Sequence, residues 1–177
     1  MNLPMKTILA ICGSTRQNSI NLELLHIISD LFKENIFIKI FTQIADLPHF
    51  NPDLDTENPP LNVTEFRDLL RKSDAILICT PEYAMGVPGT LKNALDWTVS
   101  SMDFSHKPTG LITASTSGEK GHSALLEVLE VIEADVDEHT QLLISVPRMK
   151  IKEGFITDVK THEAVINLMD ILIQKIG

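Results

Sequence analysis

The segment that decides the fold spans residues 6–21 and reads KTILAICGSTRQNSIN. Its first half, residues 6–12, is a short apolar run with several β-branched residues, which is typical of a buried strand. From Ser19 to Phe32 apolar side chains recur at the spacing of one helix face. A loop with one glycine and several hydroxyl side chains joins the two. The segment therefore predicts a strand, a polar loop and a helix in succession.

The same alternation continues along the chain. Further strands are expected at 35–41, 75–79, 109–114 and 140–146. Further helices are expected from Asn62, from about 90 to 100, after the fourth strand to about 133, and from about 158 to 175. Asn62 is the expected N-cap of the second helix, and Glu65 completes a capping-box pattern. The proline-rich stretch 45–60 is expected to be a surface excursion.

Five strands that alternate with five helices predict an α/β fold, in which a parallel sheet is covered on both faces. Right-handed crossovers favour the doubly wound, flavodoxin-like strand order 2-1-3-4-5. The length of 177 residues predicts a single domain, residues 1–177. In this order ligands bind outside the carboxyl ends of the strands, where the chain reverses between the first and third strands. The two loops at that point are residues 13–21 and 81–89.

The composition excludes some functions and leaves others open. Asp and Glu number 24 against 15 Lys and Arg, a net charge of −9, which argues against binding to nucleic acid or an anionic membrane. Cys12 and Cys79 lie in apolar runs and are expected to be buried thiols, with no disulfide framework or metal-ligand spacing. Residues 1–5 lack a signal pattern and no apolar run is long enough to cross a membrane, so a cytoplasmic location is expected.

The first loop has the chemistry of a phosphate site. Gly13 lets the backbone turn sharply, and the hydroxyls of Ser14, Thr15 and Ser19 can donate to phosphate oxygens. The free N–H groups and the dipole of the helix that follows favour an anion. Arg16 adds a permanently charged donor. A hydroxyl-rich helix cap beside a surface arginine is the alternative, and the position of the loop at the switch point favours phosphate.

Three other phosphate-related classes do not match. The chain has no G-x-x-x-x-G-K-[ST] loop for a nucleoside triphosphate and no G-x-G-x-x-G after its first strand for a dinucleotide. A receiver domain would place acidic residues after the first strand and at the end of the third. The chain has Cys12-Gly13 and Cys79-Thr80 there.

The second loop and its helix, residues 81–97, read PEYAMGVPGTLKNALDW. Two prolines and two glycines after a buried strand predict a rigid loop that exposes its backbone. Such a loop can present N–H and C=O groups to the edge of a flavin, and Tyr83 adds an aromatic body with a polar tip. The alternative is a proline-shaped turn into an ordinary helix, with Trp97 in the core.

Together the two segments resemble the signatures of the NADPH-dependent FMN reductase family, which includes quinone, chromate and azo reductases. The family motif G-S-x-R-x-x-S-x-N is matched by Gly13, Ser14, Arg16, Ser19 and Asn21. The motif P-E-Y-N-x-[SG]-x-P-x-x-L-K-N-x-x-D-W is matched at Pro81, Glu82, Tyr83, Gly86, Pro88, Leu91, Lys92, Asn93, Asp96 and Trp97. Ala84 departs from it, because the family usually has Asn at this position.

The resemblance implies a set of cofactor-binding residues and no catalytic side chain or metal, because the flavin carries the chemistry. The FMN phosphate would be held by Ser14, Arg16, Ser19 and Asn21. The flavin ring would be lined by Pro81, Glu82, Tyr83 and Ala84, largely through backbone. A third loop, residues 115–122, would close over the other side of the ring with Ser115 and Gly118, and His122 is a further candidate at the carbonyl edge of the flavin.

The implied activity is that of an oxidoreductase with NADPH or NADH as co-substrate. In the expected ping-pong cycle, the reduced nicotinamide passes a hydride to FMN and leaves, and a quinone, free flavin or similar small acceptor then collects the electrons. The resemblance also implies a homodimer or homotetramer. Two alternatives stay open, a flavodoxin-type electron-transfer protein and an FMN-binding module without turnover.

Overall fold

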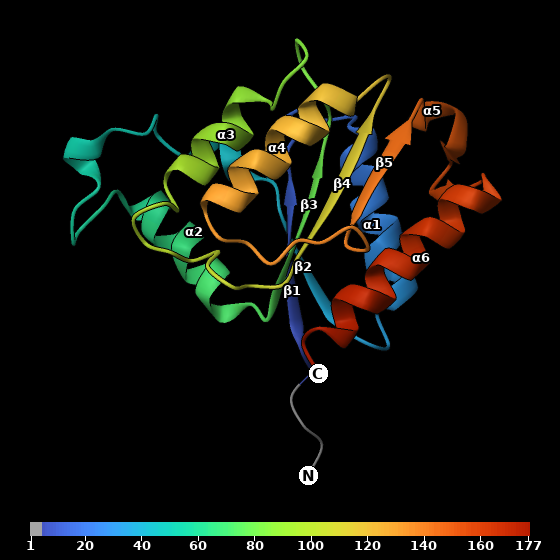
Figure 1. The fold of residues 1–177 in the computed structure, drawn as a ribbon, viewed down its shortest axis with the longest axis horizontal. Helices are drawn as coiled ribbons and strands as arrows, with labels where there is room; N and C mark the ends of the chain where they lie inside the picture. Colours follow the sequence, from blue (N-terminus) through green and yellow to red (C-terminus); the bar gives the residue numbers. More distant parts are fainter. Residues whose placement is uncertain (1–4) are drawn as a thin grey trace.

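The computed structural model describes residues 5–177. The expectation that the N-terminus carries no signal rests mainly on residues 1–4, which lie outside the described residues. Five parallel strands form one sheet in the order β2-β1-β3-β4-β5, as predicted (Figure 1). The strands are β1 (Thr7–Cys12), β2 (Phe37–Phe41), β3 (Ala75–Thr80), β4 (Thr109–Ser115) and β5 (Gln141–Ser145). Within the part of the chain described, no helix has the length and apolar character needed to cross a bilayer.

Helices cover both faces of the sheet, so each face has its own apolar core. The helices are α1 (Ile20–Phe32), α2 (Leu61–Lys72), α3 (Gly89–Asp96), α4 (Glu119–Val131), α5 (Pro147–Lys150) and α6 (Val159–Gln174). Side chains of α1 and α6 pack on one face, and those of α2, α3 and α4 pack on the other (Figure 1). β1 and β3 lie at the centre and are almost wholly buried, which explains their continuous apolar runs.

The chain reverses between β1 and β3, and the loops that follow these strands lie side by side. Cys12 and Cys79 are register partners, and the N–H of Gly13 donates to the carbonyl of Cys79 at 2.8 Å. A Cβ on Gly13 would lie 2.3 Å from the Thr80 Oγ1. The glycine is therefore needed for the close approach of the two strand ends, more than for the turn that the sequence suggested.

The structure corrects three details of the prediction. Asn62 is not an N-cap: α2 begins at Leu61 after Pro60, whose ring presets the backbone, and the Asn62 amide donates to the carbonyl of Asp46 at 2.8 Å. The third helix ends at Asp96, four residues early, and turns occupy residues 97–106. After β5 the chain forms the short α5 and the hairpin β6 (Ile151–Lys152) and β7 (Phe155–Ile156), which the sequence pattern did not predict.

The excursion 45–60 is largely irregular, as expected, with short 3-10 helices at Gln43–Asp46 and Pro52–Leu54. Two residues of the second motif hold it against α3. The carbonyl of Pro48 accepts hydrogen bonds from Asn93 Nδ2 at 3.0 Å and Trp97 Nε1 at 2.8 Å. Trp97 is fully buried in the core of its own chain, which agrees with the alternative interpretation of this motif as a turn into an ordinary helix. The Asn93 and Trp97 positions of the motif therefore serve the fold.

Candidate functional site

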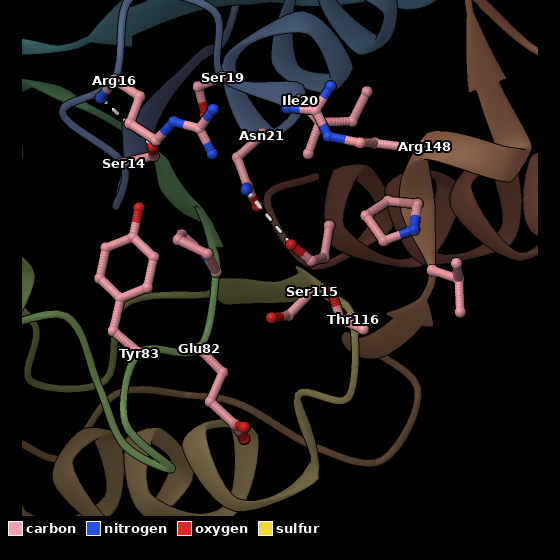
Figure 2. A pocket seen from close by; sticks show the side chains of 14 residues that line it. Ser14, Arg16, Ser19, Ile20, Asn21, Glu82, Tyr83, Ser115, Thr116 and Arg148 are labelled. Carbon is pink, nitrogen blue, oxygen red and sulfur yellow. Dashed lines mark hydrogen bonds between the residues drawn. The ribbon is translucent and has the colours of Figure 1, made fainter.

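A cavity of about 240 Å³ opens at the carboxyl ends of β1, β3, β4 and β5, at the switch point of the sheet (Figure 2). Its walls come from the loops after these four strands and from the first turn of α1. The residues that line it are Ser14, Arg16, Ser19, Ile20, Asn21, Pro81, Glu82, Tyr83, Ala114, Ser115, Thr116, Val146, Pro147 and Arg148. Eight of the ten cofactor-binding residues expected from the sequence are in this set; Ala84 and Gly118 are not.

The loop 13–21 brings donors together at one end of the cavity. Ser19 holds the N-cap position of α1, but its side chain does not cap the helix. Its Oγ is buried and, apart from the neighbouring Cys12 thiol, has no hydrogen-bond partner among residues 5–177. A buried hydroxyl with so weak a partner costs free energy unless a ligand satisfies it. Ser14 is also buried and Arg16 exposed, and the Arg16 guanidinium extends toward Ser19 (Figure 2).

Asn21 lies deeper in the same wall, and its amide is used within the protein. Its Nδ2 donates to the carbonyl of Ala114 at 3.3 Å, and its Oδ1 accepts from the Cys79 thiol at 3.4 Å. These contacts tie the first turn of α1 to the ends of β3 and β4. They fix the position of the cavity wall that the loop 13–21 and the first turn of α1 form.

The loop after β3 forms the wall opposite α1. Pro81 is buried, whereas Tyr83 is 46% exposed and its hydroxyl points toward the loop of Ser14 (Figure 2). The Glu82 carboxylate points away toward α4, so Glu82 offers the cavity mainly its backbone. Ala84 and Met85, at φ 49° and 61°, are the centre of a tight turn closed by Tyr83 and Gly86. Ala84 thus shapes the loop from outside the cavity wall.

The loop after β4 contributes Ser115 and Thr116 to the cavity. Gly118 is the N-cap residue of α4, with φ 96°, a conformation that favours glycine, and it packs toward Leu143. His122 is held beneath the loop, between Thr113 Oγ1 at 2.8 Å and Gln141 Oε1 at 3.0 Å. Both ring nitrogens are therefore occupied by protein partners.

Sequence reasoning missed the fourth wall of the cavity, which Val146, Pro147 and Arg148 supply. The stretch after the fifth strand has no strong periodicity and matched no motif, so no local signal marked it. Only the parallel strand order brings its carboxyl end beside those of β1, β3 and β4.

The two cysteines lie beneath the site in the α1 face of the sheet. Both are free and buried, as the apolar runs predicted. Burial raises the pKa of the Cys12 thiol and raises that of Cys79 well above its usual value. Both are therefore neutral thiols near pH 7. Across residues 5–177, no three His, Cys, Asp or Glu side chains gather as a metal site would require.

The sheet order and the cavity at its switch point define the class of protein: a flavodoxin-like α/β protein with a pocket where this class holds a nucleotide. A family model described as "NADPH-dependent FMN reductase" matches residues 6–141. The chain belongs to this family of oxidoreductases, and the resemblance that its two motifs indicated is confirmed.

The names of individual relatives agree with this family assignment. A quinone reductase of Pseudomonas putida strain KT2440 is 38% identical over 123 residues, which are 67% of this chain and 64% of the relative. A second quinone reductase of Pseudomonas putida is 32% identical over 155 residues, 85% of this chain and 77% of the relative. Among solved structures, the flavoenzyme NAD(P)H:(acceptor) oxidoreductase FerB from Paracoccus denitrificans has a TM-score of 0.76 at 27% identity and covers 97% of both chains. The chain thus spans slightly less than two thirds of the first relative.

Proposed function

We propose that this protein is an FMN-dependent NAD(P)H oxidoreductase that passes electrons to quinones, free flavin or similar small acceptors. One observation carries the proposal: the buried Ser19 hydroxyl, without a partner among residues 5–177 other than the Cys12 thiol, lies at the N-terminus of α1 at the switch point of the sheet. Beyond the weak acceptor or donor that the Cys12 thiol offers, this hydroxyl is available to an acceptor from outside the protein, and a phosphate oxygen is the acceptor that this helix end favours. The names of the two quinone reductases and of FerB agree with the proposed reaction.

The residues of the first loop fit a phosphate ester. The Ser14 and Ser19 hydroxyls and the first N–H groups of α1 would donate to it, and Arg16 would supply the opposing charge. The Asn21 amide would hold the first turn of α1 in place through its bond to Ala114. A protein with a net charge of −9 thus offers an anion a local site of positive potential.

The other walls fit a flat heterocycle. Bound FMN would supply the hydride-accepting and electron-donating chemistry, so no side-chain base or nucleophile is required. The backbone of Pro81, Glu82 and Tyr83 would meet the edge of the ring, with Ala84 shaping the turn behind them. Ser115 and Gly118 would form the opposite wall and the start of the helix that supports it.

The entrance of the cavity suits small planar substrates. Tyr83 is 46% exposed and Met85 is 68% exposed at the tip of the loop after β3. These apolar groups offer a surface against which a nicotinamide or a quinone can pack. A reduced nicotinamide must lie parallel to the flavin at reacting distance, which an open entrance allows.

The proposal is tested in two steps that separate binding from turnover. The protein freed of flavin should bind FMN much more tightly than riboflavin, and Arg16→Ala should weaken FMN binding by about tenfold to a hundredfold. NADH or NADPH, mixed anaerobically with the loaded protein, should then bleach the flavin, and a quinone should restore its colour. FMN binding without bleaching by either nicotinamide would contradict the reductase function and favour a flavodoxin-type carrier.

We also propose that residues 1–177 act as one domain and assemble as a homodimer or homotetramer. An apolar groove of about 350 Å³ runs between α3 and α4 on the outer surface, and Val99 and Val131 line it while exposed. Exposed apolar grooves of this kind are typical of protein interfaces. The groove lies along the helix of the second motif.

A further inference from the structure

Arg148 reaches the proposed phosphate end of the cavity from a segment that no motif marks. It lies on α5, after β5, and lines the cavity together with Ser19 and Ile20. It shares this part of the cavity lining with Ile20, at the N-terminus of α1, and in the view of Figure 2 Ser19 and Asn21 are drawn between its guanidinium and that of Arg16. Neither arginine forms an ion pair within 4 Å with a carboxylate of residues 5–177.

The fold holds this segment in place at both ends. Val146, with φ 50° and ψ 52°, is in the left-handed region that β-branched residues rarely adopt, and its N–H donates to the Ser115 carbonyl at 3.0 Å. The turn at Val146 directs α5 back over the cavity. At the other end, Gly154 in the β6–β7 hairpin donates its N–H to the Glu23 carboxylate of α1 at 3.1 Å. Arg148 is thus presented to α1 by a segment tied to β4 and α1.

A phosphate monoester has enough acceptor oxygens to receive charge-assisted hydrogen bonds from two guanidinium groups at once. The monoester carries about −1.5 to −2 charges near pH 7. The N-terminus of a helix offers roughly half a positive charge, and Arg16 adds one. Together these offset about 1.5 charges, and a second arginine on the opposite side would offset the remaining charge of a dianion and supply further charge-assisted hydrogen bonds.

We propose that Arg148 is a second ligand of a phosphate monoester and that, with Arg16, it makes the site selective for phosphorylated ligands. The inference rests on the proposed function, because it takes that site to be the phosphate site. Two ligands of this enzyme class carry a phosphate monoester, FMN itself and the 2′-phosphate of NADPH. FMN is the favoured ligand, because Arg148 lines the same cavity as Ser19 and the rest of the first loop.

The test compares Arg148→Ala with a matched control, Lys150→Ala, which removes one positive charge from the same helix at a residue that does not line the cavity. Fluorescence titrations of the flavin-free proteins with FMN and with riboflavin give the selectivity without any turnover. We expect Arg148→Ala to weaken the affinity for FMN by about tenfold and to leave the affinity for riboflavin within twofold. The loss of FMN affinity should be smaller at pH 5 than at pH 7.5, because the phosphate loses charge below about pH 6. Lys150→Ala should leave both affinities within twofold.

A second arm identifies the source of the phosphate. If Arg148→Ala leaves FMN affinity unchanged but raises the KM for NADPH and not for NADH, the ligand is the 2′-phosphate. The proposal would be overturned if Arg148→Ala lost equal affinity for FMN and riboflavin. It would also be overturned if neither the affinity for FMN nor the KM for NADPH changed. Equal affinity of the unaltered protein for FMN and riboflavin would instead overturn the phosphate site itself, so the two failures are distinguishable. Arg148→Lys keeps the charge and loses the planar fork, so its affinity for FMN should lie between those of the unaltered protein and Arg148→Ala.

Discussion

The Glu82 carboxylate accepts a hydrogen bond at 2.7 Å from the N–H of Gly121, in the first turn of α4. This contact fastens the loop after β3 to the helix after β4, and no side chain fits between them. A Cβ on Gly121 would lie 2.9 Å from Glu82 Cγ and 3.0 Å from the Gly86 carbonyl oxygen. Two walls of the cavity therefore depend on one glycine and one carboxylate.

Gly121→Ala should lower the free energy of unfolding, by about 1–3 kcal/mol, because the added methyl group overpacks this contact. Helix propensity alone predicts the opposite sign, a gain of about 1 kcal/mol. Urea unfolding of the flavin-free protein distinguishes the two. Ser123→Ala, an exposed site on the same helix, is the control and should have little effect. A stabilised Gly121→Ala protein would show that the contact is looser than described.

Ser19→Ala should separate stability from binding. Apart from a weak contact with the Cys12 thiol, the Ser19 hydroxyl has no partner within residues 5–177, so its loss should leave the melting temperature of the flavin-free protein nearly unchanged. FMN binding should weaken by about tenfold if the hydroxyl meets the phosphate. Melting curves with and without FMN measure both effects. A drop in melting temperature without flavin would mean that Ser19 serves the helix instead.

Ala84→Asn should stabilise the loop after β3. Ala84 and Met85 both have positive φ, the pattern of a type I′ turn, in which Asn is favoured and other L-residues are strained. We expect a gain of about 0.5–1 kcal/mol in urea unfolding. Ala84→Val, with a β-branched side chain, should instead lose stability. If both substitutions changed the free energy of unfolding in the same direction, the described turn would be contradicted.

Stability at acid pH should depend on the pair between Asp55 and Arg67, whose side chains are 10% and 6% exposed and 2.7 Å apart. Burial alone would raise the pKa of Asp55, but hydrogen bonds from Ser100 and Arg67, with the Arg67 charge, hold the pKa below its usual value. The pair therefore stabilises the fold above the unfolded Asp pKa of about 3.9, and this contribution is lost as pH falls through the lower folded value. Asp55→Asn should cost about 3 kcal/mol at pH 7 and flatten the decline below pH 4, as urea unfolding across pH can measure.

Val131→Lys should break the proposed assembly. Val131 is 76% exposed in the groove between α3 and α4, and a charge there would be buried in an interface. Light scattering at micromolar concentration should give at least twice the chain mass of 19.7 kDa for the unaltered protein and a monomer for the variant. Val159→Lys, at a 68% exposed position on α6, is the matched control. A monomeric unaltered protein would refute the assembly.

The strand order, the position of the cavity at the switch point and most residues of three of its walls were predictable from the amino-acid sequence alone. Central parallel strands are buried on both faces, so β1 and β3 appear as continuous apolar runs, and right-handed crossovers then leave few arrangements. The two motifs at residues 13–21 and 81–97 follow those strands directly. Their local chemistry, hydroxyls with an arginine and prolines with glycines, is readable without any contact between distant segments.

The contacts that those residues make depend on the three-dimensional fold and could not be predicted from local patterns. The Asn62 cap was wrong because Pro60 starts the helix first, and Asn93 and Trp97 turned out to bind the excursion at Pro48. Arg148 had no signal at all, because its place in the cavity depends on β5 ending beside β4 and on the left-handed turn at Val146. Local patterns record which face of an element is buried, whereas the partners across a site are set by distant strands that end at the same edge of the sheet.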